Sequence, residues 1–180
     1  MSMPFHIRAA LPSDAAGLSR VQVDSWRAHF RGLLADIHLD NATYQEQEND
    51  WLELVDVPDS ILYVATDGQN AIVAYARAVR YRGSERRDSE LVSIHMRPEL
   101  KRHGIGRCLF RRCAEHLRDG GARSHMLWCL TGNTNARGFY DSLGGTIVAE
   151  QTVFIADEPA DEVLYEWPDI DDLIHALGGI

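Results

Sequence analysis

The segment ELVSIHMRPELKRHGIGRCLF, residues 90–110, decides how the chain is interpreted. Residues 90–96 form a nearly continuous apolar run that predicts a buried strand, and Pro98 ends it. A helix is predicted over residues 104–118, because apolar residues recur there every four positions. These positions are Ile105, Leu109, Cys113 and Leu117. The segment therefore reads as a strand, a basic loop and an amphipathic helix in succession.

The junction between this strand and this helix has the chemistry of an anion site. Gly104 and Gly106 lack Cβ and let a ligand approach the backbone closely. The unpaired N–H groups and the dipole of a helix N-terminus attract negative charge. Between Leu100 and Ala114 there are no acids and five cations, which are Lys101, Arg102, Arg107, Arg111 and Arg112. The alternative is an ordinary helix start with solvated arginines. Neither a GxxxxGK[ST] phosphate loop nor a GxGxxG dinucleotide fingerprint is present.

A second informative segment, LWCLTGNTNARGFYDSLGG, covers residues 127–145. It joins a buried strand predicted over residues 125–130 to a short helix predicted over 133–143, which Gly144 and Gly145 end. Two strand–helix units thus follow one another.

The rest of the chain predicts a mixed order of strands and helices. A helix is expected from Ser13, its N-cap, to about residue 30, and a second over 41–55. Residues 31–39 are expected to form a loop or short helix, 81–89 an exposed loop, and 169–177 a terminal helix or tail. Further strands are expected at 5–10, 61–66, 71–81, 146–155 and 162–167, with turn residues 67–70 closing a hairpin. The class is mixed α/β (α+β), since too many strands follow one another for a doubly wound parallel sheet.

Composition excludes several function classes. The chain has 180 residues, of which 45% are hydrophobic and 25% charged, as expected for a single globular domain over residues 1–180. Its net charge of −9 disfavours nucleic acid as a partner and suits a cationic small molecule. No membrane span or secretory signal is evident. Three cysteines without CxxC spacing predict buried thiols in a reducing cytoplasm, and scattered histidines predict no metal site.

Taken together, the two segments resemble the GNAT superfamily of acyl-CoA-dependent N-acetyltransferases. Lys101, Gly104 and Gly106 stand where that family's motif A has Arg or Gln, Gly, and Gly or Ala, so Lys101 is a departure. The second motif of the family is matched by Asn133, Ala136, Phe139, Tyr140, Leu143 and Gly144. The resemblance is sharp over about 55 residues. It implies a central, mostly antiparallel twisted sheet of about seven strands, flanked by about four helices and splayed between the fourth and fifth strands.

The resemblance also implies how acetyl-CoA would be held. The backbone of Ile94 and Met96, with His95 between them, would lie against the pantetheine arm. The N–H groups around Lys101 and from Arg102 through His103, Gly104, Ile105 and Gly106 to Arg107 would bind the diphosphate. Asn133 would hydrogen-bond the pantetheine arm, or simply cap its helix. Asn135 is a second candidate for this contact with the arm, or it simply caps the helix.

Catalytic roles follow from the same resemblance. Tyr140 would protonate the leaving thiolate, unless it is a packed core tyrosine. A strand bulge near Met96 would supply an N–H to the developing oxyanion. Glu90 is the candidate general base, or an exposed strand-end charge. His95 has a suitable pKa for proton transfer, although a structural role is the simpler reading.

The acceptor side is expected to involve Trp26, His29 and Phe30, with Trp51 nearby. Aromatic side chains bind ammonium groups by cation–π contact, and the acids Glu46, Glu48, Asp50 and Glu53 would attract them. Core aromatics and a solvated helix face are the alternative.

The expected function is therefore transfer of an acetyl group from acetyl-CoA to a primary amine of a small molecule or peptide, through a ternary complex. The expected enzyme is cytoplasmic, contains no metal and binds neither nucleic acid nor membrane; a homodimer is compatible with the family. The alternative is a catalytically silent acyl-CoA sensor.

Overall fold

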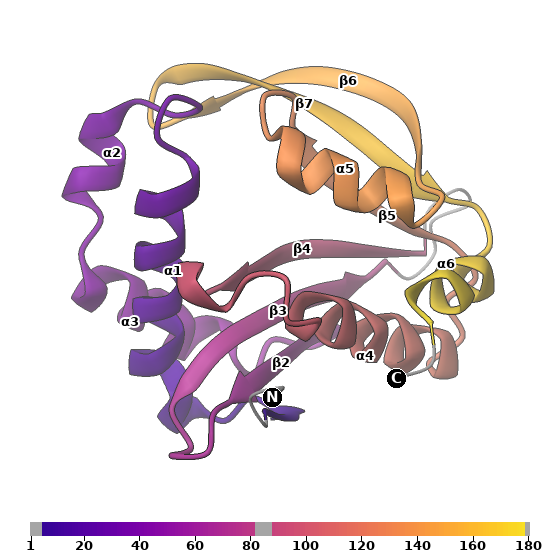
Figure 1. The fold of residues 1–180 in the computed structure, drawn as a ribbon, viewed down its shortest axis with the longest axis horizontal. Coiled ribbons are helices and arrows are strands. Elements are labelled where there is room, and N and C mark those ends of the chain that lie inside the picture. Colours follow the sequence, from indigo (N-terminus) through magenta and orange to yellow (C-terminus); the bar gives the residue numbers. More distant parts are fainter. Residues whose placement is uncertain (1–4, 82–87, 179–180) are drawn as a thin grey trace.

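The computed structural model describes residues 5–81 and 88–178, and within them seven strands form one sheet in the order β1-β2-β3-β4-β5-β7-β6 (Figure 1). The strands are β1 (His6–Ala9), β2 (Ser60–Thr66), β3 (Ile72–Arg80), β4 (Ser89–Met96), β5 (His125–Leu130), β6 (Thr146–Ile155) and β7 (Glu158–Trp167). The α-helices are α1 (Ala15–His29), α2 (Asp36–Asn41), α3 (Tyr44–Leu54), α4 (Ile105–Asp119), α5 (Thr134–Ser142) and α6 (Ile170–Leu177). Short 3-10 helices at Pro12–Asp14 and Pro98–Leu100 complete the described elements.

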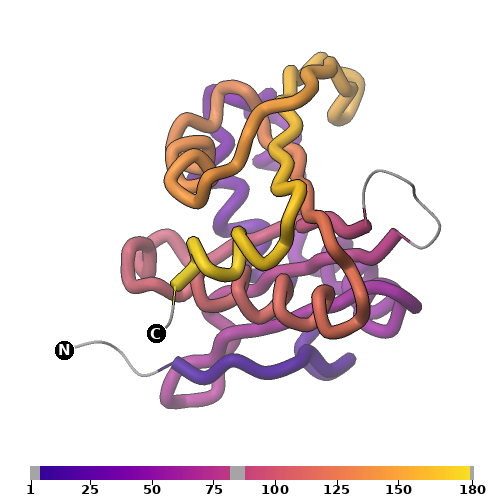
Figure 2. The backbone as a smooth tube through the Cα atoms, turned by 90° about the vertical axis from the view of Figure 1, so that its right-hand side faces the viewer, coloured from indigo at the N-terminus to yellow at the C-terminus, as the bar shows by residue number. Residues whose placement is uncertain are grey.

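The sheet opens between β4 and β5. These two strands are parallel and share one paired position, Glu90 with Met126, whereas every other pair of neighbours is antiparallel. Beyond Glu90, β4 stays paired with β3 as far as Met96, and β5 stays paired with β7 along its whole length. Figure 2 shows the β5–β7–β6 part rising above the β1–β4 part. The predicted splay between the fourth and fifth strands is confirmed.

Helices cover both faces of the sheet. On one face α4, α5 and α6 enclose a core that includes Phe110, Tyr140 and Leu173. On the other face α1 and α3 enclose a smaller core around Leu18 and Trp51. The described residues hold six α-helices, so the expectation of about four is too low. The tail forms α6 because its apolar residues Ile170, Leu173, Ile174 and Leu177 fall on one buried face.

Two local predictions need correction. Ser13 is not the N-cap of the first helix: Pro12–Asp14 form a 3-10 turn, and Asp14 precedes α1. The Asp14 carboxylate instead accepts hydrogen bonds from the N–H of Leu11 at 2.8 Å and from the Arg8 guanidinium at 2.6 and 2.8 Å. The last strand begins at Glu158 rather than 162. Ala156 and Asp157 both have positive φ and form the tight turn between β6 and β7. Neither is a glycine or asparagine, the residues from which such a turn is usually predicted.

Other local predictions hold. The hairpin at residues 67–70 is confirmed, and the Asp67 carboxylate accepts from the N–H groups of Gln69 and Ala71 at 2.9 Å each. Cys108, Cys113 and Cys129 are buried free thiols. The loop predicted over 81–89 lies mostly in residues 82–87, outside the described part. No helix among the described residues is long and apolar enough to cross a bilayer.

The close packing beneath α5 yields a stability prediction. A Cβ on Gly145 would lie 2.6 Å from Trp167 Cζ2 and 2.9 Å from Tyr165 Cδ1, both in rigid, buried rings. We expect Gly145→Ala to lower the free energy of unfolding by about 1–3 kcal/mol, measured by urea denaturation. Gly68→Ala is the control, because open space surrounds Gly68. Equal stability of the two variants would contradict the packing described.

Candidate active site

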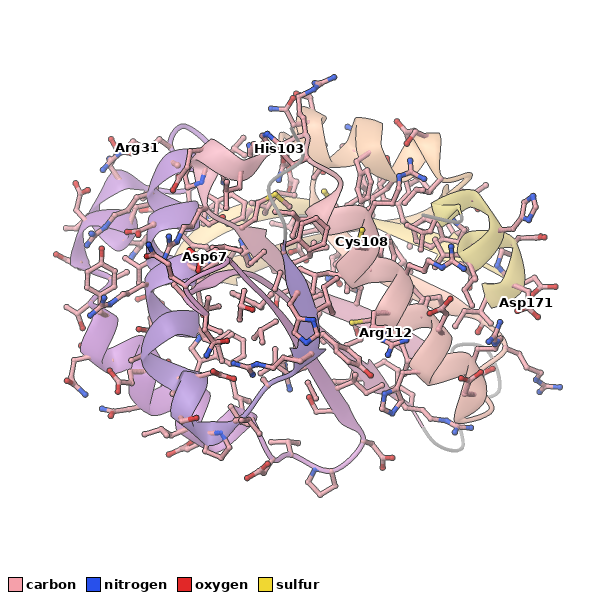
Figure 3. The ribbon with its side chains drawn as sticks, turned by 60° about the horizontal axis from the view of Figure 1, so that its bottom comes forward. Arg31, Asp67, His103, Cys108, Arg112 and Asp171 are labelled. Atoms are coloured by element: carbon pink, nitrogen blue, oxygen red, sulfur yellow. The ribbon has the colours of Figure 1, made fainter. Side chains whose placement is uncertain are left out.

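The segment between β4 and α4 leaves a row of backbone N–H groups unpaired. Within the described residues, none of the N–H groups of residues 102–107 donates to the protein; the first helical bond of α4 runs from Cys108 N to Gly104 O, at 3.0 Å. Arg102 and Gly104 have φ of 67° and 81°. Left-handed residues of this kind turn successive N–H groups toward a common point, which makes an anion-binding concavity. In Figure 3, His103 lies in this segment, and Cys108 and Arg112 follow along α4.

Three of the five basic side chains predicted to cluster here make contacts within the protein. Arg107 donates to the carbonyl of Ala176 at 2.6 Å. Arg111 pairs with Glu115 at 2.8 Å, and Arg112 lies over the ring of Tyr63. These contacts lie within α4, with β2 and with α6, so among the five cations Lys101 and Arg102 are the two whose exposed side chains have no such partner among the described residues. Backbone N–H groups, more than side-chain charge, therefore characterise this candidate anion site.

The edge of β4 that faces the splay also carries unpaired backbone groups. Arg97 N–H donates to Val73 O at 2.9 Å, which points Arg97 toward β3. Because strand residues alternate, the N–H and C=O groups of Ile94 and Met96 point away from β3, toward the side that β5 has left. Their side chains reach α4, and a Cβ on Gly106 would lie 2.8 Å from Met96 Cε. The second glycine of the segment therefore lets α4 start close to β4.

The strand bulge is not where it was predicted. Ser93 pairs with Arg77 and Leu91 with Ala78, so the extra residue is Val92, and the expectation of a bulge near Met96 is wrong. Val92 is exposed. Because it lies in a continuous apolar run, the sequence does not show that strand pairing is interrupted there. Met96 nevertheless presents its N–H to the splay, through the alternation described above.

Tyr140 is buried as a ring but free at its hydroxyl. The ring lies 6.4 Å from Phe110, 5.5 Å from Tyr165 and 6.4 Å from Trp167, centroid to centroid. Within the described residues its hydroxyl makes no hydrogen bond, yet it is not among the enclosed unpartnered polar atoms. Burial raises the pKa of Tyr140 above its ordinary value, so the phenol keeps its proton at neutral pH. The predicted donor is thus an accessible O–H held in a rigid aromatic cluster.

Asn133 is the N-cap of α5. Its Oδ1 accepts from Ala136 N at 3.2 Å, which leaves Nδ2 as the group able to bind a ligand. Asn135 lies exposed in the first turn and is not the cap. The preceding Gly132 touches the segment between α1 and α2, since a Cβ there would meet Leu33 Cδ2 at 2.6 Å. These two loops therefore meet beyond the C-terminal end of β5.

Glu90 lies at the closed end of the splay, where β4 still pairs with β5. Its carboxylate accepts a hydrogen bond from the hydroxyl of Tyr81. Burial and this bond raise the pKa of Tyr81 to about 12. Arg77 lies near enough for its charge to interact with Glu90. The carboxylate is thus engaged away from the open part of the gap, and its role as a base stays a prediction.

The predicted acceptor residues meet on the α1 side of the sheet. The ring of Phe30 packs edge-on against His95 at 6.0 Å and against Trp26 at 6.2 Å. His29 joins them through Ser25, whose hydroxyl lies 3.1 Å from Nδ1 of both His29 and His95. The ring of His95 therefore faces α1 rather than the loop before α4. Sequence reasoning missed Ser25, whose link to a strand 70 residues away has no sequence signal.

Trp51 belongs to the core. It is 3% exposed and packs edge-on against Tyr75 at 4.8 Å. The acids predicted to attract an ammonium group lie on α3 with Trp51, three of them exposed and one half-buried. These acids are Glu46, Glu48, Asp50 and Glu53. The solvated-face alternative therefore fits their exposure. Within the described residues, no His, Cys, Asp and Glu side chains gather in a way that could hold a metal ion.

Comparisons with known proteins agree with this geometry. The model of the acetyltransferase (GNAT) family matches residues 22–144. YuaI, an uncharacterized N-acetyltransferase of Bacillus subtilis (strain 168), is 31% identical over 170 residues, which cover 93% of this chain and 95% of the relative.

Solved structures give the same fold. The PaiA N-acetyltransferase of Thermoplasma acidophilum, in complex with coenzyme A, has a TM-score of 0.76 at 15% identity and covers 91% of this chain and 98% of its own. YncA of Salmonella typhimurium, with its cofactor acetyl-CoA, has a TM-score of 0.68 at 20% identity and covers 93% and 94%.

Proposed function

The chain belongs to the GNAT family of acetyltransferases, and on this premise we propose that it moves the acetyl group of acetyl-CoA to a primary amine of a small molecule or peptide. The observation that carries the proposal is the row of unpaired N–H groups at residues 102–107 beside the open edge of β4. The complexes of the Thermoplasma and Salmonella proteins with coenzyme A and acetyl-CoA support the choice of ligand. The buried free thiols are in keeping with a reducing cytoplasm.

The residues fit acetyl-CoA in three places. The concavity of residues 102–107 would bind the diphosphate through backbone N–H groups, with Lys101 and Arg102 adding charge. The outward N–H and C=O groups of Ile94 and Met96 would pair with the pantetheine amides as a neighbouring strand would. Asn133 Nδ2 would donate to the same arm.

Acetyl-CoA supplies a thioester carbonyl that a neutral amine can attack. Met96 N–H, which points into the splay, would donate to the carbonyl oxygen as it gains charge. Tyr140 O–H would donate to the departing sulfur. An alkylammonium has a pKa of about 10, so the amine must first lose a proton on the α1 side. The amine would thus enter from α1 and the thioester from α4.

Calorimetry and thiol release together test the proposal. We expect acetyl-CoA to bind with a Kd in the micromolar range, and free thiol to appear when an amine panel is added with acetyl-CoA. The panel should contain alkyl diamines, amino acids and short peptides. Binding without thiol release from any amine would instead indicate the sensor. Absence of binding heat would contradict both functions.

A further inference from the structure

A hydrogen-bonded chain of three side chains connects β4 to α1. Ser25 and His29 lie one helical turn apart on α1, so both face the sheet. The Ser25 hydroxyl lies 3.1 Å from Nδ1 of His29 and 3.1 Å from Nδ1 of His95. Ser25 is 2% exposed, which shields the chain from competing water.

The two histidine rings are held but not closed off. Phe30 and Tyr75 pack against His95 at 6.0 and 5.5 Å. Within the described residues, the hydrogen bonds of both rings use Nδ1, and neither Nε2 is an enclosed unpartnered atom. His125 differs, because it bonds Ser89 at 2.7 Å while its Nε2 is enclosed and unpartnered. His125 is a core residue, whereas His29 and His95 each keep one nitrogen open.

A shared hydroxyl couples the tautomers of the two rings. A serine hydroxyl has one proton, so between two Nδ1 atoms it donates to one and accepts from the other. One ring must then be protonated on Nδ1 and the other on Nε2. A proton gained on the open Nε2 of one ring can therefore leave from Nε2 of the other after two short transfers.

The surroundings of His29 and His95 disfavour the protonated, charged form of either ring, so a proton that enters the chain is passed on. Burial lowers the pKa of His95 to about 4, and burial together with the Lys101 ammonium lowers the pKa of His29. Among the described residues, Tyr75 of β3 is a further titratable group beside the pair: its ring packs against His95, and burial raises its pKa. Both rings are thus neutral at pH 7, and neither holds a proton for long.

We propose that His95, Ser25 and His29 form the relay that removes the proton of the acceptor amine. As the neutral amine nitrogen bonds to the thioester carbonyl carbon, its N–H bond breaks and the proton joins Nε2 of His95. The C–S bond then breaks, and the thiolate takes the proton of Tyr140, which Tyr140 regains from water. The Nδ1 proton of His95 passes to the Ser25 oxygen, the Ser25 proton passes to Nδ1 of His29, and the Nε2 proton of His29 goes to water. His95 is the catalytic residue of the relay, and Ser25 and His29 act through it. The inference rests on the proposed function.

Nitrogen-15 spectra of the histidines in the full chain test the hydrogen-bond chain without any acceptor. Near neutral pH we expect His29 and His95 to show opposite tautomers. We expect Ser25→Ala to remove this opposition, because the coupling hydroxyl is gone. Identical tautomers in the unaltered chain, or opposite tautomers that persist in Ser25→Ala, would overturn the relay.

Steady-state kinetics with the fastest amine of the panel test its use. We expect kcat to fall about 100-fold in His95→Gln and about tenfold in Ser25→Ala, with the KM for acetyl-CoA within about twofold. Ser25→Thr keeps a hydroxyl and should retain most of the kcat. Ser19→Ala is the control, since Ser19 is equally buried on α1 but donates only to Ala16 O at 3.0 Å.

The outcomes separate the two proposals. An unchanged kcat in Ser25→Ala, or an equal loss in Ser19→Ala, would overturn the relay while leaving the acetyltransferase intact. A larger loss in Glu90→Gln than in His95→Gln would assign the base to Glu90 and overturn it as well. If the unaltered protein turns over no amine, the proposed function fails, and the relay fails with it whatever the histidine spectra show.

Discussion

Replacement of Tyr140 by phenylalanine should lower kcat about 100-fold, the lower end of what a positioned acid contributes. The substitution keeps the ring, which packs among Phe110, Tyr165 and Trp167, and removes only the hydroxyl. That hydroxyl is accessible and without a partner among the described residues, so its loss leaves no buried group unsatisfied. The departing sulfur would lose its donor, whereas acetyl-CoA binding and folding should persist. Thiol-release assays measure kcat, and calorimetry separately measures the Kd for acetyl-CoA.

Tyr165→Phe is the matched control for this experiment. Tyr165 belongs to the same aromatic cluster, but its hydroxyl is already used as a donor to Asp141, at 2.7 Å. We expect kcat of this variant to stay within about threefold of the unaltered protein. Equal losses of kcat in both variants would assign the effect to packing. A full kcat in Tyr140→Phe would remove Tyr140 from the chemistry.

A carboxylate at Gly104 should weaken acetyl-CoA binding at least about tenfold, or about 1.4 kcal/mol. Gly104 has φ of 81°, a conformation that costs an L-residue about 1–2 kcal/mol. The new charge would also lie beside the N–H groups that are proposed to bind the diphosphate. Gly104→Ala carries the strain without the charge, so it should bind more tightly than Gly104→Asp. Calorimetry with coenzyme A measures all three Kd values.

Gly32→Asp controls for strain and charge elsewhere. Gly32 has φ of 78° and open space around it, like Gly104, but it lies between α1 and α2. Its Kd for coenzyme A should remain within about twofold of the unaltered value. If Gly104→Asp binds as tightly as Gly32→Asp, the diphosphate does not lie against residues 102–107.

Strong local patterns made much of this fold predictable. The apolar run at 125–130 and the strand at 146–155 were predicted with the bounds that β5 and β6 have. The spacing of Leu109, Cys113 and Leu117 placed α4 within one residue of its observed ends. The need for glycine at the left-handed position 104 and at the close helix–strand contact of residue 106 could also be predicted. Few other residues adopt such a backbone conformation or leave room for such a contact.

Features set by tertiary contacts were not predictable. Val92 is a bulge because β3 and β4 pair on both sides of it, and its apolar side chain does not announce this. The sequence suggests Arg107 as an anion ligand, but its guanidinium donates a hydrogen bond to the carbonyl of Ala176 in α6. Ser25 gains its significance from His95, and only the packing of α1 on β4 brings them together. A single sequence contains no signal for such partners.

Amide NMR spectra of the full chain, recorded while coenzyme A is added, examine the anion site itself. The backbone N–H signals of residues 102–107 should shift strongly with coenzyme A and with ADP, which shares its diphosphate, and only weakly with pantetheine, which has none. Saturation with coenzyme A that leaves these signals in place, while others move, would contradict the site proposed here.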